Sequence, residues 1–131
     1  MDADSGIGRA PLGQDQLGLI VEVFRMLSDA TRIQVLWALV DGERSVTELA
    51  EYTGKPAPSV SQHLAKLRMA RLVSTRRSGT TIYYCIDNEH IRQLVTDAVF
   101  NAEHAGPGIP AHHRGDTEVS RLGTTARQSG T

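Results

Sequence analysis

Residues 45–86 read SVTELAEYTGKPAPSVSQHLAKLRMARLVSTRRSGTTIYYCI, and two helix signals stand in the first part of this stretch. Ser45 is followed three residues later by Glu48, a capping pair that opens a short helix, and Gly54 ends this helix. A second helix begins near Pro58 or Ser59, because proline is tolerated in a first turn. The residues that face inward from this helix are Val60, Leu64, Leu67 and Leu72. The pattern predicts two short helices separated by a tight turn.

The last part of the same stretch favours strands. Residues 73–77 and 80–86 are β-prone runs on either side of Ser78-Gly79, which predicts a hairpin with basic residues near its tip. A helix, a short turn, a second helix and a basic hairpin, in this order, are typical of a winged helix-turn-helix. The expected fold class is therefore mainly α with a β-hairpin wing.

Two core helices are expected before this stretch. The first carries apolar residues at helical spacing: Leu17, Ile20, Val21, Phe24 and Leu27. The second covers residues 30–40 and ends at Asp41-Gly42, with Ile33, Val35, Leu36, Trp37 and Leu39 as its apolar residues.

A last helix is expected from Asn88 to about Ala105, where Gly106-Pro107-Gly108 ends it. Its apolar stripe is suited to pairing with a second copy of the chain and consists of Ile91, Leu94, Val95, Ala98, Val99 and Ala102. We therefore expect a homodimer that forms through terminal helices.

The 131 residues are expected to form one domain between two tails. Residues 1–14 are Gly-rich and aperiodic, and residues 114–131 are polar with almost no large apolar side chains. We expect a flexible tail over 1–14, the winged helix-turn-helix DNA-binding and dimerisation domain over 15–105, and a flexible, His-containing tail over 106–131.

The net charge of −1 conceals a strong segregation of charge along the chain. Between Gly54 and Ile86 there are six basic residues and no acidic ones, which leaves eight basic and fifteen acidic residues elsewhere. A basic face on an acidic body is the electrostatic pattern of a nucleic-acid-binding protein. The segment 54–86 therefore predicts contact with double-stranded DNA.

The second helix of the pair supplies the residues that would read DNA. An α-helix fits the major groove, where hydroxyl and amide groups read base edges, while Lys and Arg neutralise phosphates. The base-reading candidates are Ser59, Ser61, Gln62 and His63, and the phosphate-contacting candidates are Lys66, Arg68, Arg76 and Arg77.

His90, Asp97 and His104 follow one another at seven-residue intervals in the last helix. Two such steps drift only about 40°, so the three side chains share one edge. Fourteen residues span about 21 Å, whereas metal–nitrogen bonds are about 2 Å long, so His90 and His104 of one chain cannot hold the same ion. Two last helices that pack antiparallel and cross near Asp97 would instead create two equivalent sites, each shared between the chains.

The candidate metal ligands are His90, Glu103, His104, His112 and His113. The last two follow a flexible GPGIP segment that could fold back over the site. A nitrogen and oxygen donor set without thiolate suits nickel or cobalt better than four-coordinate zinc, which stays as an alternative. The alternatives that histidines in a tail are merely solvated, and that Asp97 pairs with Arg92, also stay open.

The stretch LSDATRIQVLWALVDGERSVTELAEYTGKPAPSVSQHLAKLRMARLVSTRRSGTTIYY, residues 27–84, resembles the ArsR/SmtB family of metal-responsive repressors. The features LxDxTRxxIL, S.HLxxLxxAGLV and R.G....Y carry the resemblance, which covers residues 24–105. One departure is Met69-Ala70-Arg71, where the family commonly has a glycine before the final Leu-Val. This departure alters a turn.

The resemblance implies a dimer that binds its operator without metal and is released when nickel or cobalt binds. Sensors with their site in the last helix carry Asp-x-His at its start and a His/Glu pair near its end, which His90 and Glu103-His104 resemble. Asp87 stands one residue too far from His90 for this pattern, and Asn101 replaces a histidine that relatives often have. The thiolate site of arsenic, cadmium and lead sensors is not expected, because residues 48–51 read ELAE.

Cys85 is the only cysteine, which excludes an intramolecular disulfide and a Cys-rich zinc site. No stretch approaches the roughly 20 apolar residues of a membrane span, so we expect a cytoplasmic protein without membrane contact. An enzyme is not expected, because there is no glycine-rich phosphate loop and no nucleophile with a base. The rival hypotheses are a metal-blind repressor of the same fold and a metal-storage or delivery protein.

Overall fold

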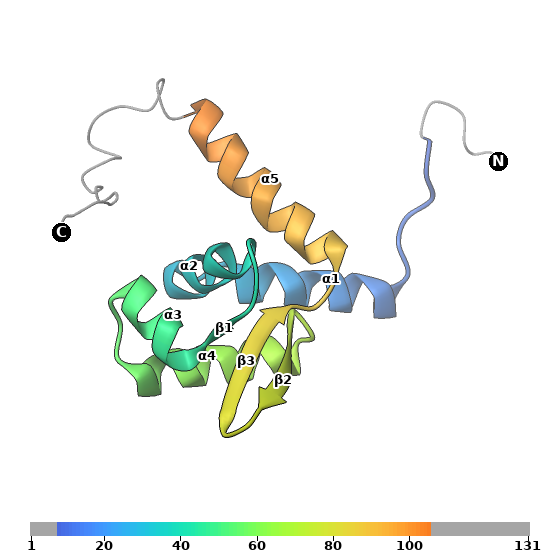
Figure 1. Ribbon diagram of the computed structural model, residues 1–131. Coiled ribbons are helices and arrows are strands. Elements are labelled where there is room, and N and C mark those ends of the chain that lie inside the picture. The colour runs from blue at the N-terminus through green and yellow to red at the C-terminus, as the bar shows by residue number, and fades with distance from the viewer. Residues whose placement is uncertain (1–7, 106–131) are drawn as a thin grey trace. The chain divides into compact units, whose positions relative to one another are not determined.

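The computed structural model describes residues 8–105, which form a mainly α-helical chain with a small sheet (Figure 1). The elements are α1 (Gln14–Leu27), α2 (Ala30–Leu39), β1 (Arg44–Ser45), α3 (Val46–Thr53), α4 (Ala57–Met69), β2 (Val73–Ser78), β3 (Thr81–Ile86) and α5 (Glu89–Ala105). The chain divides into two compact units, Met1–Val95 and Thr96–Thr131. The first holds all elements up to the early turns of α5, and the described part of the second is the remainder of α5. The predicted fold class is confirmed.

The start of α3 forms as the sequence predicts. The Glu48 amide donates to Ser45 Oγ at 3.2 Å, and the Ser45 amide donates to Glu48 Oε1 at 2.9 Å, which completes a capping box. Gly54 ends the helix with a φ of 70°. The amides of Gly54 and Lys55 both donate to the carbonyl of Ala50, at 2.9 and 3.2 Å. These contacts fix the turn that leads into α4.

The end of α4 uses a similar C-terminal turn without glycine. The helix begins at Ala57, slightly earlier than predicted, and ends at Met69, so Leu72 lies beyond it. Arg71 has a φ of 62°, and no other non-glycine residue of the described chain has a positive φ. The Leu72 amide donates to the carbonyl of Leu67 at 2.9 Å, which is the long hydrogen bond of a Schellman motif.

The predicted hairpin forms, and it gains a third strand. β2 and β3 pair antiparallel, with Ser78 opposite Thr81, so that Gly79 and Thr80 make the turn. Gly79 has a φ of 64°, a conformation that costs glycine little. β1 pairs antiparallel with the other edge of β3 through Arg44 and Ser45, giving the order β1-β3-β2. This strand was not predicted, because two residues are too few to show a β period.

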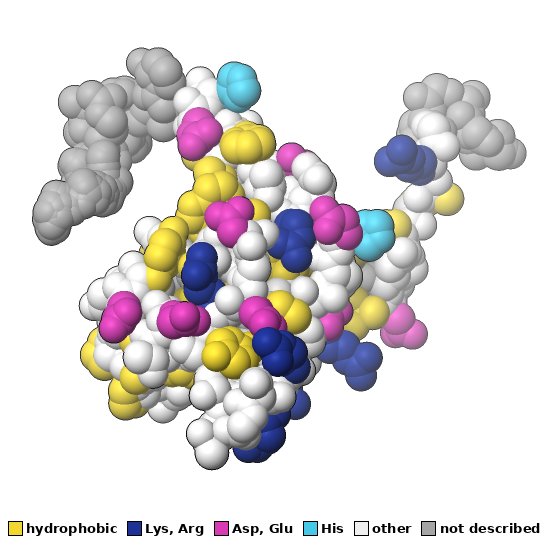
Figure 2. All heavy atoms as spheres, in the orientation of Figure 1, with side chains coloured by type: hydrophobic (Ala, Val, Ile, Leu, Met, Phe, Trp, Pro, Cys, Tyr) yellow, Lys and Arg dark blue, Asp and Glu magenta, His cyan; other side chains and the backbone are white. Residues whose placement is uncertain are grey.

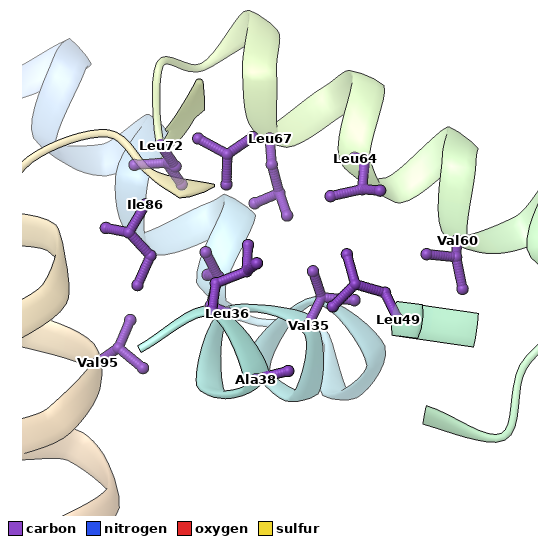
Figure 3. Close-up of a cluster of buried hydrophobic side chains, with 12 residues drawn as sticks. Val35, Leu36, Ala38, Leu49, Val60, Leu64, Leu67, Leu72, Ile86 and Val95 are labelled. Carbon is purple, nitrogen blue, oxygen red and sulfur yellow. The ribbon is translucent and has the colours of Figure 1, made fainter. Parts of the chain in front are cut away.

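The core of the first unit lies between α2, α3, α4 and the sheet (Figure 3). Val60, Leu64 and Leu67 of α4 are fully buried, and Leu72 and Val73 continue this surface into β2. From the opposite side α2 contributes its own buried residues, Val35, Leu36, Ala38 and Leu39. Ile33, which the sequence placed with them, is instead 41% exposed. The predicted inward face of α4 is confirmed.

The expectation that the apolar stripe of α1 lies in the core holds for Leu27 and is wrong for Leu17, Val21 and Phe24. The helix forms, but it has no buried residue, and Leu17, Val21 and Phe24 are all more than 40% exposed. The residues of α1 that pack against the core are Val23, Met26 and Leu27. A helical period identifies residues that share a face, but it does not say which surface covers that face.

The apolar stripe of α5 is partly buried in the core and partly exposed. Val95 is buried in the core of the first unit, and Ile91 packs against it. In the second unit Ala98 and Ala102 are exposed, as is Phe100. The early part of the stripe is therefore occupied within its own chain, which corrects the expectation that the whole stripe pairs with a second copy. No helix within residues 8–105 is long and apolar enough to cross a membrane.

Candidate nucleic-acid interface and metal-ligating residues

The helix pair α3–α4 presents the polar face on which the sequence placed base readers. Ser61 and Gln62 are exposed on α4, opposite its buried apolar residues, and Ser59 is half-buried in its first turns. Lys66 and Arg68 are exposed nearer the end of the helix. Hydroxyl and amide groups thus precede basic groups along one solvent-facing side of α4, an arrangement that suits base edges and phosphates in turn.

His63 lies differently from its neighbours on α4. Its ring is half-buried, and Nδ1 lies 3.3 Å from a guanidinium nitrogen of Arg32, so it accepts a hydrogen bond from α2. The same guanidinium donates through Nε to the carbonyl of Met26 at 2.7 Å. His63 is therefore engaged in a contact between helices, and a role in base reading would have to use its other ring nitrogen.

The two arginines of the wing have different surroundings. Arg76 donates to both carboxylate oxygens of Glu43, at 2.8 and 2.5 Å, and its guanidinium lies 5.0 Å from the ring centre of Tyr83. The hydrogen bonds from Arg76 lower the pKa of Glu43, and Glu43 in turn raises the pKa of Arg76. Successive residues of a strand point to opposite faces, so Arg77 projects away from this ion pair.

Basic side chains without a partner concentrate in the segment that contains α4 and the wing. Arg25, Arg32, Arg44 and Arg92 all donate to carboxylates or backbone carbonyls. Among residues 8–105, the basic side chains with no hydrogen bond or ion pair are Arg9, Lys55, Lys66, Arg68, Arg71 and Arg77. Figure 2 shows Lys and Arg side chains gathered over the β2–β3 hairpin at the lower edge of the view. Lys55 and Arg71 were not among the predicted phosphate contacts, although their charges were visible in the sequence.

The candidate metal ligands of α5 are exposed. His90 lies in the first turn, within the first unit, while Glu103 and His104 lie in the last turn, within the second. Nδ1 of His104 lies 3.2 Å from the carbonyl oxygen of Phe100. A carbonyl only accepts, so Nδ1 is the donor in this contact, and in the neutral ring the lone pair then lies on Nε2. A backbone carbonyl in this role is the usual outer partner of a metal-binding histidine.

The nitrogen and oxygen donors of these side chains suit a divalent first-row metal ion. His90, Glu103 and His104 offer exposed imidazoles and a carboxylate, and His104 has its free nitrogen already defined. Within residues 8–105 of one chain, no three His, Cys, Asp or Glu side chains lie close enough together to hold an ion. His112 and His113 lie outside the described residues.

Comparison with known proteins identifies the family. Residues 29–75 match the bacterial regulatory protein, arsR family. The chain is 75% identical over 114 residues to the HTH-type transcriptional regulator KmtR of Mycobacterium tuberculosis, covering 87% of this chain and 86% of that protein. This chain belongs to the ArsR family. It is also 32% identical over 104 residues to the HTH-type transcriptional regulator NmtR of the same organism, covering 79% of this chain and 87% of NmtR.

Solved structures of two mycobacterial proteins share the fold. A homodimeric winged helix-turn-helix DNA-binding domain from Mycobacterium bovis, Mb0332, superposes with a TM-score of 0.65 at 29% identity, over 76% of this chain and 94% of that domain. Rv0081 of M. tuberculosis superposes with a TM-score of 0.64 at 31% identity, over 73% of this chain and 97% of Rv0081. The chain is thus a DNA-binding transcriptional regulator with the winged helix-turn-helix fold.

Proposed function

We propose that this ArsR-family regulator is a homodimeric repressor that binds operator DNA without metal and releases it when nickel or cobalt binds. The observation that carries the DNA-binding part is the polar, exposed face of α4 beside unpaired basic side chains of the acid-free segment. Binding through such a face is dominated by phosphates and weakens as salt rises. The regulators KmtR and NmtR, which the chain resembles over most of its length, support the regulatory role.

On the DNA, we assign base reading to α4 and phosphate contact to α4 and the wing. Ser59, Ser61 and Gln62 are the proposed base readers, with His63 available through Nε2 while Nδ1 is held by Arg32. The proposed phosphate contacts are Lys66, Arg68, Arg76 and Arg77. In a dimer the two α4 helices would enter successive major grooves about 34 Å apart on an inverted repeat.

A second copy of the chain is the proposed partner of the exposed apolar stripe of α1. Leu17, Val21 and Phe24 would lose contact with water in a dimer, and Mb0332 with the same fold is homodimeric. The domain limits we propose are those of the sequence prediction, 15–105. All described helices and strands lie inside them except for Gln14, the first residue of α1, and His112 and His113 belong to the segment that follows.

The proposed effector site uses His90 of one chain with Glu103 and His104 of the other, together with His112 and His113. When bound, a nickel or cobalt ion would supply a cross-link that favours one dimer geometry over another. The hydrogen bond from His104 Nδ1 to the Phe100 carbonyl fixes the ring for this role. The length of α5 supports sharing between chains, since fourteen helical residues span about 21 Å.

The test is a mobility-shift titration of the full chain on the DNA upstream of its own gene, with nickel, cobalt and zinc in turn. We expect nickel or cobalt to weaken DNA binding by about 5- to 150-fold, the range of allosteric coupling. His104→Ala should bind DNA normally and lose this release, whereas Asn101→Ala, an exposed neighbour on α5, should keep it. Unchanged release by His104→Ala would refute the proposed site.

A metal-blind repressor is the second candidate function. It would bind the same DNA with salt sensitivity, and equilibrium dialysis at micromolar nickel or cobalt would find no bound ion. A metal-storage protein would instead bind metal without salt-sensitive DNA binding. The relatives are transcriptional regulators, which favours both regulatory candidates over storage and over an enzyme.

A further inference from the structure

Arg71 occupies a backbone position that suits glycine. It stands between α4 and β2 with a φ of 62°, where a side chain crowds the following carbonyl. Its amide donates to the carbonyl of Arg68 at 3.0 Å, and the Leu72 amide donates to Leu67 at 2.9 Å. Leu67 and Leu72 are both buried, which is the apolar contact that accompanies a Schellman motif. The left-handed conformation at Arg71 thus accompanies the burial of both leucines in the core.

The chain itself offers the comparison with glycine. α3 ends in the same way, with a left-handed Gly54 whose φ is 70° and with the following amide donating five residues back, from Lys55 to Ala50. Glycine therefore fills this position at one helix end, and arginine fills it at the other. The backbone of the α4 turn gains nothing from the arginine side chain, because a residue without Cβ adopts the conformation more readily.

The Arg71 side chain also makes no stabilising polar contact within the described part of the chain. It is exposed and has no hydrogen bond or ion pair with any residue in 8–105. It lies close in sequence to Lys66 and Arg68, inside the segment that contains no acidic residue. Strained residues that persist without internal benefit concentrate at functional sites. A free guanidinium between the recognition helix and the wing is suited to a phosphate.

We propose that Arg71 contacts a phosphate of the bound DNA, and that this contact is the functional reason for an arginine at the strained turn. The inference rests on the proposed DNA-binding function and adds to it a residue outside the expected set. A phosphate contact carries no sequence information, so it should contribute equally to operator DNA and to a random duplex.

The test compares Arg71→Gly with the unaltered chain in thermal unfolding and in DNA binding over a range of salt. Relief of strain should raise the Tm by about 4–8 °C. Loss of the contact should weaken binding to operator and random duplex alike, and should reduce the slope of log K against log salt by about 0.9 per bound subunit. Arg71→Lys should recover most of the slope, because it keeps the charge.

Arg9→Gly is the matched control, because it removes the same unpaired charge from an exposed site outside the acid-free segment. It should change neither Tm nor slope. An unchanged slope in Arg71→Gly, or a lowered Tm together with weaker binding, would overturn the inference, the latter by showing that Arg71 stabilises the end of α4. Failure of the unaltered chain to bind either duplex would instead refute the proposed function, and this inference with it.

Discussion

Asp29 and Arg32 join three helices at the level of single side chains. Asp29 Oδ1 accepts the Arg32 amide at 3.0 Å and caps α2. The Arg32 side chain reaches back to the carbonyl of Met26 in α1 and lies against His63 in α4. The backbone hydrogen bond from Arg32 is the main reason that the pKa of Asp29 is lowered. The carboxylate form of Asp29 therefore stabilises the folded state.

The first prediction concerns the acid stability of this cap. A lowered pKa in the folded state means that the stabilisation is present above about pH 4, the ordinary value for Asp, and is lost as pH falls through the folded pKa. Asp29→Asn keeps a capping oxygen but cannot titrate. The free energy of unfolding, measured with urea between pH 2.5 and 6, should therefore fall less steeply with acid in Asp29→Asn.

Equal slopes for the variant and the unaltered chain below pH 4 would contradict this prediction. Asp15→Asn is the matched control, because Asp15 is an exposed acid in the first turn of α1, and this change should leave the acid slope close to that of the unaltered chain.

At the scale of the elements, the wing is held to the body through one of its two arginines. Glu43 precedes β1 and binds Arg76 of β2, and Tyr83 of β3 lies directly opposite Arg76 in the strand register. The ion pair thus spans the small sheet and compensates the charge of Arg76. Arg77 has no such partner among the described residues, so its full charge is available to DNA.

This difference predicts unequal effects on DNA binding. Arg77→Gln should reduce the slope of log K against log salt by about 0.9 per bound subunit, which corresponds to one lost phosphate contact. Arg76→Gln should reduce it by less, because Glu43 already neutralises much of that charge. Fluorescence anisotropy on the same duplex at several salt concentrations measures both slopes.

Glu43→Gln gives the complementary measurement for the wing. It frees Arg76 and removes a negative charge near it, so DNA affinity should rise at low salt and Arg76→Gln should then cost more in the Glu43→Gln background. Equal slopes for Arg76→Gln and Arg77→Gln in the unaltered background would refute the proposed difference between the two arginines.

At the scale of the whole molecule, α1 leaves apolar side chains uncovered in a single chain. Phe24 is 56% exposed and Val21 55%, and both belong to the stripe that the sequence placed in the core. The helix uses another side, with Val23 and Met26, to pack against its own domain. A helix that is apolar on two sides has two surfaces to cover, and a second subunit is the proposed cover for the exposed one.

The third prediction tests whether α1 forms the dimer interface. Phe24→Glu would bury a charge in the proposed dimer and should raise the dimer dissociation constant by about 100-fold or more. Sedimentation equilibrium measures the change, and circular dichroism should show an unchanged fold, because Phe24 is exposed in the single chain. Met69→Glu, at an apolar residue that is 86% exposed on α4, should leave the dimer intact. A dimer of normal affinity in Phe24→Glu would mean that α1 is not the interface.

The sequence alone was sufficient wherever a local signal carries its own meaning. The Ser45 capping box, the left-handed Gly54, the inward face of α4 and the hairpin at Gly79 all formed as predicted, because caps, turns and periodicity depend on neighbours within a few residues. The segregation of charge was equally visible, since it needs only a count along the chain.

Only the tertiary structure decided which surface covers each helix face and which charge finds a partner. The sequence could not show that α1 turns its best apolar stripe outward, that Glu43 takes up Arg76, or that Arg32 engages His63. It also could not show that Arg71 adopts a conformation suited to glycine, because that depends on Leu67 and Leu72 entering one core. The covering of α1 and the two side-chain contacts depend on residues distant in sequence that meet only when the chain has folded, and the turn at Arg71 depends on the core into which its neighbouring leucines pack.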